Sequence, residues 1–162
     1  MISRQAWLWY CASLFIVILD QLSKLWVSRS LTYGVPVELA PFFNFTLLHN
    51  HGAAFSFLSD AGGWQRWFFA IIALVVSVTL VIWIARVVAK SQREAFALAF
   101  ILGGALGNLV DRVALGYVVD FIVLHYSDNF FPAFNLADSA ITLGAGVLIL
   151  DLFLKKEMKS NA

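Results

Sequence analysis

The chain has 162 residues, of which 61% are hydrophobic and 13% charged, and its mean hydropathy is +0.83. This composition excludes an ordinary soluble domain and is typical of an integral membrane protein, which we expect to form a single domain over residues 1–162. The formal net charge of +1 gives no electrostatic reason to expect a nucleic-acid partner. Cys11 is the only cysteine in the sequence, so no internal disulfide can form.

The first apolar segment, residues 6–27, is long enough to cross the roughly 30 Å hydrocarbon core of a bilayer as a helix. No small-x-small cleavage site follows it, so we expect an uncleaved first span. Its last turns carry Asp20 and Lys24, which lie on one helix face because they are four residues apart. Two interpretations stay open: Asp20 faces the protein interior and belongs to a site, or the two residues form a surface ion pair.

Residues 28–63 interrupt the apolar pattern and form the expected outer region. Gly34, Pro36 and Pro41 separate short alternating segments, which are typical of strands in a small extramembrane β-sheet. We expect this sheet to rest on the lipid headgroups.

The segment 49–56 of this region reads HNHGAAFS and combines polar groups with small residues, so its backbone can approach a ligand closely. On a strand, His49 and His51 would share one face, which raises the possibility of a zinc site. No further cluster offers a third ligand, and we therefore expect no metal.

Three more spans are predicted, over residues 67–85, 95–113 and 137–154. The first of these carries no charge and has tryptophans at both ends, as expected at the two membrane interfaces. The other two carry small residues at four-residue spacing, which lets a neighbouring helix pack closely. These small residues are Ala99, Gly103, Gly107, Ala140 and Gly144. The sequence thus predicts an all-α membrane protein, a four-transmembrane-helix bundle with a small extramembrane β-sheet and loop.

The basic residues predict the orientation of this bundle. Seven of the eleven Lys and Arg residues lie before the first span, between the second and third, or after the fourth: Arg4, Arg86, Lys90, Arg93, Lys155, Lys156 and Lys159. Because such residues favour the cytoplasmic side, we expect both termini in the cytoplasm. The outer region and the other ends of the helices then face away from the cytoplasm. Near the far end of the last span, Asp151 precedes Lys155 by four residues, which predicts an interfacial ion pair.

Several polar residues converge on this outer surface, and two of them are carboxylates that flank a predicted loop, Asp120 and Asp138. Two neighbouring carboxyls at a membrane edge tend to share one proton, because both cannot ionise cheaply there. The ionised group can then take a proton from water while the protonated group polarises a carbonyl, which is what peptide hydrolysis without a metal requires.

Each of these residues also has a plainer interpretation. Asn135 and Asp138 have the spacing of a helix N-cap and its acidic partner. Asn108 and Arg112 could end a helix and reach the headgroups, and Asp120 could be a solvated loop charge.

Five segments resemble, in order and spacing, the bacterial lipoprotein signal peptidase family, also called signal peptidase II. They are DQLSK (20–24), HNHGAAFS (49–56), GNLVDR (107–112), VDF (119–121) and FNLADSA (134–140). The resemblance covers nearly the whole chain.

The resemblance implies a cofactor-free aspartic endopeptidase that removes signal peptides from diacylglyceryl-modified prolipoproteins, cutting before the lipidated cysteine at the outer face of the bacterial inner membrane. Asp120 and Asp138 match the catalytic dyad of the family. The residues that match its surrounding polar groups are Asn50, Asn108, Arg112 and Asn135, and Asp20 matches a supporting residue of the first span. The implied partners are the lipid-modified prolipoprotein and membrane lipids, and we expect a monomer.

A small transporter or ion-binding protein is the competing class, in which intramembrane carboxylates would relay protons or bind cations. The sequence has no evident inverted repeat, and its carboxylates gather at one surface and not at the bilayer midplane, so this class is disfavoured. A purely structural membrane protein would leave the polar segments unexplained.

Overall fold

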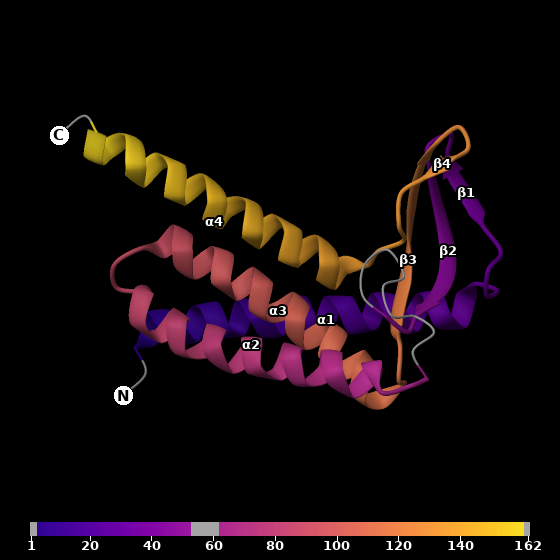
Figure 1. Ribbon diagram of the computed structural model, residues 1–162, viewed down its shortest axis with the longest axis horizontal. Helices are drawn as coiled ribbons and strands as arrows, with labels where there is room; N and C mark the ends of the chain where they lie inside the picture. The colour runs from indigo at the N-terminus through magenta and orange to yellow at the C-terminus, as the bar shows by residue number, and fades with distance from the viewer. Residues whose placement is uncertain (1–2, 53–61, 161–162) are drawn as a thin grey trace.

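The computed structural model describes residues 3–52 and 62–160. It contains four helices that are long and apolar enough to cross a membrane. They are α1 (Arg4–Ser30), α2 (Gln65–Val87), α3 (Gln92–Ala114) and α4 (Leu136–Ser160). The four predicted spans are therefore confirmed, and each helix extends a few residues beyond the predicted bounds. In Figure 1 both chain ends lie at one end of the bundle and the sheet stands at the other.

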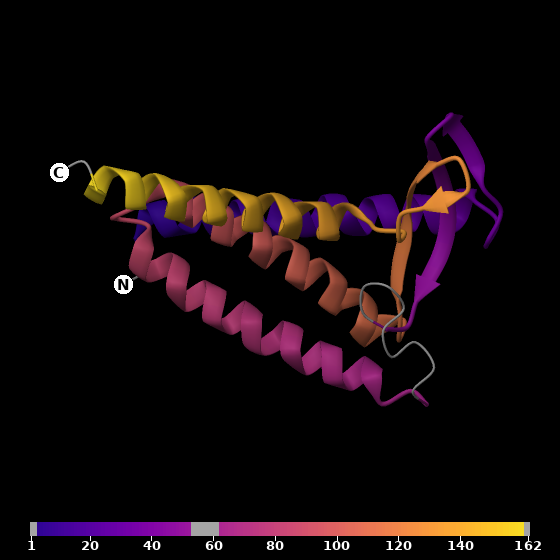
Figure 2. The same ribbon diagram turned by 45° about the horizontal axis from the view of Figure 1, so that its top comes forward.

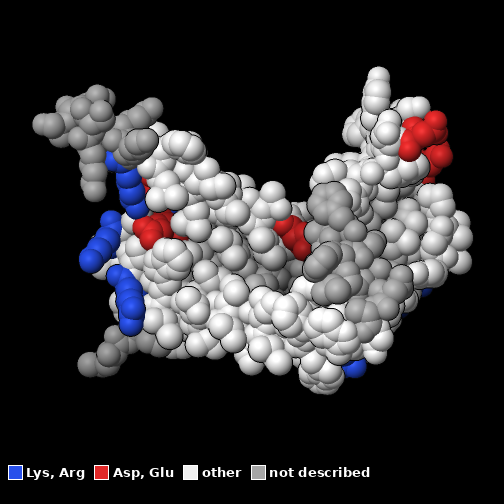
Figure 3. Space-filling model, in the orientation of Figure 1, with Lys and Arg blue, Asp and Glu red and all other residues white. Residues whose placement is uncertain are grey.

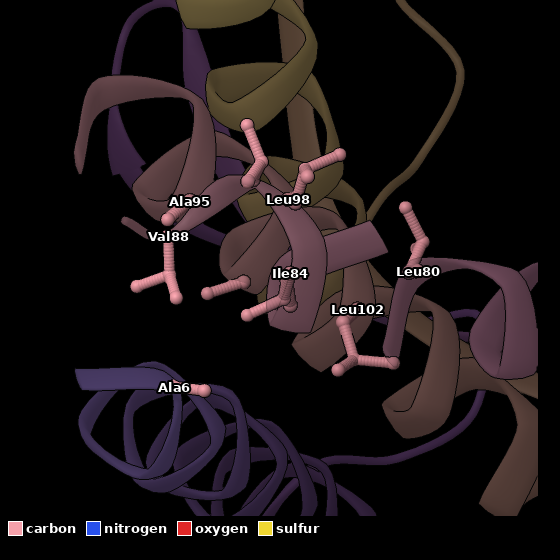
Figure 4. Close-up of a cluster of buried hydrophobic side chains, with 9 residues drawn as sticks. Ala6, Leu80, Ile84, Val88, Ala95, Leu98 and Leu102 are labelled. Atoms are coloured by element: carbon pink, nitrogen blue, oxygen red, sulfur yellow. The ribbon is translucent and has the colours of Figure 1, made fainter. Parts of the chain in front are cut away.

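Helix α3 packs against each of the other three helices. One hydrophobic cluster lies where α1, α2 and α3 meet (Figure 4). Its labelled members are Ala6, Leu80, Ile84, Val88, Ala95, Leu98 and Leu102. Most other large side chains of α2 are exposed, as expected for a helix that faces lipid.

Small residues bring the helices close together. A methyl group added at Gly103 would lie 2.8 Å from the Cβ atom of Ile16 on α1. One added at Gly144 of α4 would lie 2.5 Å from the Ala97 carbonyl oxygen of α3. Both distances are well inside van der Waals contact, so the prediction that these faces allow close helix packing is confirmed.

The sheet has four antiparallel strands in the order β1-β2-β3-β4. The strands are β1 (Val37–Ala40), β2 (Phe43–Asn50), β3 (Val118–Tyr126) and β4 (Asn129–Phe130). Two views show the sheet running across the helix direction at one end of the bundle (Figures 1 and 2). The expected strands of the outer region are β1 and β2, whereas β3 and β4 come from the later segment.

The later segment corrects one expectation: Asp120, expected to flank a loop, lies on β3, one of the two inner strands of the sheet. Its backbone is paired with β2, where Leu48 is its partner. A strand whose partner comes from a distant part of the chain has little local signal beyond its composition. Val27 of α1 and Phe121 belong to a second buried cluster, which joins the sheet to the end of the first helix.

Candidate active site

Asp120 on β3 and Asp138 in the first turn of α4 converge on one residue, Asn135. The Asn135 side-chain Nδ2 donates to Oδ1 of Asp120 at 2.7 Å, and its backbone N–H donates to Oδ2 of Asp138 at 3.3 Å. Strand β3 and helix α4 thus bring together the two carboxylates that the sequence analysis selected. Asp138 is only partly buried. Figure 3 shows acidic atoms in the hollow between the helices and the sheet.

Asp138 also takes part in the helix cap that its spacing from Asn135 predicted. The backbone N–H of Asp138 donates to Oδ1 of Asn135 at 2.9 Å, so each residue bonds the backbone of the other. A cap alone would leave the second carboxylate oxygen free. That oxygen, Oδ1, accepts from Asn108 Nδ2 at 2.8 Å, so Asp138 belongs both to the cap and to a larger polar network.

Asp120 is only 3% exposed, which rules out a solvated loop charge. Its second oxygen, Oδ2, accepts from Asn50 Nδ2 at 3.0 Å. Burial raises the pKa of Asp120 to about 7, and the nearby charge of Asp138 adds to this rise. The hydrogen bonds from Asn50 and Asn135 act in the opposite direction without cancelling it. The carboxyl can therefore carry a proton near neutral pH.

Arg112, in the last turn of α3, points toward the segment that follows β2. Its Nη2 donates to the Gly52 carbonyl oxygen at 3.2 Å, and its guanidinium lies 5.4 Å from the centre of the Phe69 ring. This placement favours a site residue over a headgroup anchor. Arg66 of α2 donates to the backbone carbonyl of Arg112 at 2.7 Å and to that of Val113 at 2.6 Å, so it satisfies the end of α3.

Asp20 and Lys24 do form an ion pair, at 2.8 Å, but the surface interpretation is wrong. Their side chains are 0% and 4% exposed, and Lys24 also contacts Asp111 of α3 at 2.9 Å. Asp20 in turn accepts from the backbone N–H of Ala137 at 2.9 Å, so it supports the start of α4. The second ion pair of the sequence analysis, Asp151 with Lys155, is also present.

Three further polar residues belong to this network: Lys24, Asp111 and Gln21, whose Nε2 donates to Asp111 Oδ1 at 2.8 Å. The sequence analysis named Lys24 only as a possible partner of Asp20 and did not select Asp111 or Gln21. The spacing of Asp20 and Lys24 was visible in the sequence, but nothing local indicated burial. Asp111 stands beside Arg112 in the segment that carries the family resemblance, and this adjacency was the one signal that could have drawn attention to it.

The two histidines that raised a zinc site lie against aromatic rings. The His49 ring stacks on Tyr117 with a centroid distance of 4.0 Å and lies 4.7 Å from the ring of Tyr33. Burial and the neighbouring His51 lower the pKa of His49. Within the described residues, no three histidine, cysteine or acidic side chains lie close enough to hold a metal ion. Residues 53–56 of the HNHGAAFS segment lie outside the described part of the chain.

Known proteins can be compared with this arrangement. A family model described as signal peptidase (SPase) II matches residues 12–154. The chain belongs to the signal peptidase II family. The lipoprotein signal peptidase of Cellvibrio japonicus is 58% identical over 158 residues, which cover 98% of this chain and 93% of the relative. The lipoprotein signal peptidase of Pseudomonas putida is 53% identical over 156 residues, which cover 95% of this chain and 90% of the relative.

Solved structures agree with this membership of the signal peptidase II family. One bacterial membrane enzyme, determined by the in meso method at 2.3 Å resolution, superposes with a TM-score of 0.79 at 34% identity, covering 92% of this chain and 89% of its own. A second, at 1.9 Å, gives a TM-score of 0.72 at 35% identity and coverages of 88% and 90%. The bundle with its end-on sheet is therefore the fold of a multi-pass membrane enzyme.

Proposed function

We propose that this chain is an aspartic endopeptidase that removes signal peptides from diacylglyceryl-modified prolipoproteins, cleaving before the lipidated cysteine. Membership of the signal peptidase II family and relatives named lipoprotein signal peptidase support this function. The observation that carries the mechanism is the junction at Asn135, which hydrogen-bonds both Asp120 and Asp138.

In this proposal the two carboxyls share one proton in the resting enzyme. The ionised carboxylate takes a proton from water as the water oxygen attacks the scissile carbonyl carbon, and the protonated carboxyl gives its proton to the carbonyl oxygen. The resulting gem-diol collapses as the C–N bond breaks: the carboxyl that took the proton from water gives it to the amine nitrogen of the lipidated cysteine, and one gem-diol hydroxyl returns its proton to the other carboxylate, so the pair again holds one proton. The elevated pKa of Asp120, about 7, suits it to hold the shared proton at neutral pH.

The surrounding polar groups have positioning roles. Asn50, Asn108 and Asn135 each donate to a carboxylate oxygen and hold the dyad in place. Arg112 would hold a substrate carbonyl, because its planar fork of donors suits such an oxygen. Asp20 supports the site through its bond to the first turn of α4.

The proposed membrane orientation places both termini in the cytoplasm and the dyad at the outer face of the inner membrane, in a monomer. Basic side chains gather at the end of the bundle opposite the sheet (Figure 3), which supports this orientation. A reporter fused after Ala162 should then work only in a cytoplasm-dependent form, and one inserted near Asp60 only in an exported form. The opposite pattern would overturn the orientation and the outward-facing site together.

The function is tested by incubating the purified protein in lipid with a prolipoprotein that carries the diacylglyceryl group. We expect the released signal peptide by mass spectrometry, with a new N-terminus at the lipidated cysteine. The same precursor without the lipid is the matched control and should remain intact. Intact lipidated precursor, from a protein shown to be folded, would contradict the proposed function.

A further inference from the structure

A buried lysine lies behind the proposed dyad, and the mechanism above does not use it. The Lys24 ammonium is 2.8 Å from Asp20 Oδ2, 2.9 Å from Asp111 Oδ2 and 3.0 Å from Asn108 Oδ1. Its three N–H donors therefore match three acceptors. Because its side chain is only 4% exposed, it cannot reach a substrate directly, and any effect on catalysis must pass through its partners.

The asparagines around the dyad share one arrangement. The side-chain oxygen accepts from a group that can only donate, either a backbone N–H or an ammonium. The NH₂ group therefore faces a carboxylate. In Asn50 the oxygen accepts from the Gly52 backbone N–H at 3.0 Å, and the NH₂ group faces Asp120. In Asn135 the oxygen accepts from the Asp138 backbone N–H at 2.9 Å, and the NH₂ group again faces Asp120.

Asn108 follows the same rule with a different donor, since its oxygen accepts from the Lys24 ammonium and its NH₂ group faces Asp138. Rotating this amide by half a turn would set its NH₂ group against an ammonium and its oxygen against a carboxylate oxygen. Both contacts would be repulsive, because an ammonium cannot accept and a carboxylate cannot donate. The Asn108 oxygen also accepts from the Asn135 Nδ2 group at 3.2 Å, so two side chains, Lys24 and Asn135, hold this amide. Lys24 is the charged and the nearer of the two donors, and Asn135 itself bonds the dyad, so Lys24 is the one that substitution can remove without deleting a direct bond to Asp120 or Asp138.

We propose that Lys24 is a positioning residue of the catalytic site: it fixes the orientation of the Asn108 amide and thereby keeps a hydrogen-bond donor on Asp138. This inference rests on the proposed function. Lys24 also brings a positive charge to a cluster of carboxylates, which face it from α1 (Asp20), α3 (Asp111), β3 (Asp120) and α4 (Asp138). Its charge lowers the pKa of Asp120 and so partly opposes the effect of burial.

The test is steady-state cleavage of the lipidated prolipoprotein by Lys24→Met, a substitution that keeps the length of the side chain and removes its donors and charge. We expect kcat per folded molecule to fall about 30-fold, as is usual when a group that orients a site residue is lost, with KM within about threefold of wild type. The basic limb of the pH–rate profile should move to higher pH, because loss of the cation raises the pKa of Asp120.

Lys24→Met leaves two buried carboxylates with less compensation and can reduce the folded fraction. The double variant with Asp111→Asn removes one positive and one negative charge and so keeps the net charge of the cluster; it should fold and show the same two changes. Lys155→Met is the matched control, because Lys155 also pairs with an aspartate four residues earlier and with a second acid, Glu94. It should leave kcat and the pH profile unchanged.

Two results would overturn the inference. One is a double variant that cleaves at the wild-type kcat; the other is a loss of activity that follows the folded fraction while the pH profile stays in place, which a purely structural lysine would produce. Both results require an active wild-type enzyme, so they leave the proposed function intact. A wild-type chain that failed to cleave would overturn the proposed function, and the inference with it.

Discussion

The two ends of the bundle each carry an Asp-x-x-x-Lys ion pair, Asp20 with Lys24 near the sheet and Asp151 with Lys155 at the opposite end. The spacing is identical, and both aspartates are buried. The lysines differ, since the Lys24 side chain is 4% exposed and that of Lys155 is 41% exposed. Helical spacing therefore predicts the pair but not its environment.

The exposure of each lysine depends on the residues from other helices and strands that cover the ion pair. At the sheet end, Asp111 accepts from Lys24 and from the backbone N–H of Val119, so it ties α1 and α3 to the start of β3. At the other end, Lys155 joins Asp151 to Glu94 of α3 and remains half open to its surroundings. The first pair is thus part of the proposed catalytic site, and the second is a clamp between α3 and α4.

The two ends of the bundle should differ most in what a substitution does to cleavage, and the largest loss of activity is expected at the dyad near the sheet. Asp120→Asn removes the group that holds the shared proton and should reduce cleavage by at least about 10³-fold, while the protein still inserts and accumulates. The measurement is the rate of signal-peptide release per folded molecule. Residual activity within tenfold of wild type would mean that Asp120 does no acid–base chemistry.

Arg112→Lys should have the next largest effect although it preserves the charge. One ammonium cannot reproduce the planar donors that reach the Gly52 carbonyl, so we expect a loss of about 10- to 100-fold in kcat/KM. Arg29→Lys, at the end of α1, is a control with the same chemistry and should be neutral. Normal turnover by the Arg112 variant would reduce this residue to a headgroup anchor.

The pH dependence gives a smaller but more specific signature. A raised pKa means that Asp120 keeps its proton up to about pH 7 and loses it above that value. The kcat/KM of the free enzyme should therefore fall as the pH rises through about 7, and it should also fall in acid when the second carboxyl of the pair becomes protonated. A rate that continued to rise above pH 8 would contradict the shared proton.

The smallest effect is expected for the histidines that raised a metal site. His49→Gln combined with His51→Gln should leave kcat within roughly threefold, because both rings lie against Tyr117 and have no part in the proposed acid–base chemistry. Prolonged treatment with a chelator should also leave cleavage intact. Activity that disappeared with chelator and returned with zinc would assign the chemistry to a metal and not to the aspartates.

The spans and the small-residue faces could be predicted from the sequence because their signals are local: long uncharged runs and four-residue spacing. The position of Asp120 could not, because β3 exists only through pairing with β2, whose residues lie far earlier in the chain. The burial of Lys24 escaped prediction for the same reason, since its covering partner Asp111 comes from α3. Asp120 and Asp138 could be selected from their placement at the outer surface, and the family resemblance matched them to the catalytic dyad, whereas the spacing of Asn135 and Asp138 alone indicated only a helix cap.

The most direct test of the contrast uses one substitution at the two ends of α4. Asp138→Asn and Asp151→Asn each remove one carboxylate from the same helix, and both are measured for cleavage and for melting temperature in the same lipid. We expect the first variant to lose at least about 10³-fold in kcat with little change in melting temperature, and the second to keep its kcat while melting roughly 2–4 °C lower. If Asp138→Asn cleaved normally and only melted earlier, Asp138 would be a helix cap and the proposed aspartic mechanism would be wrong.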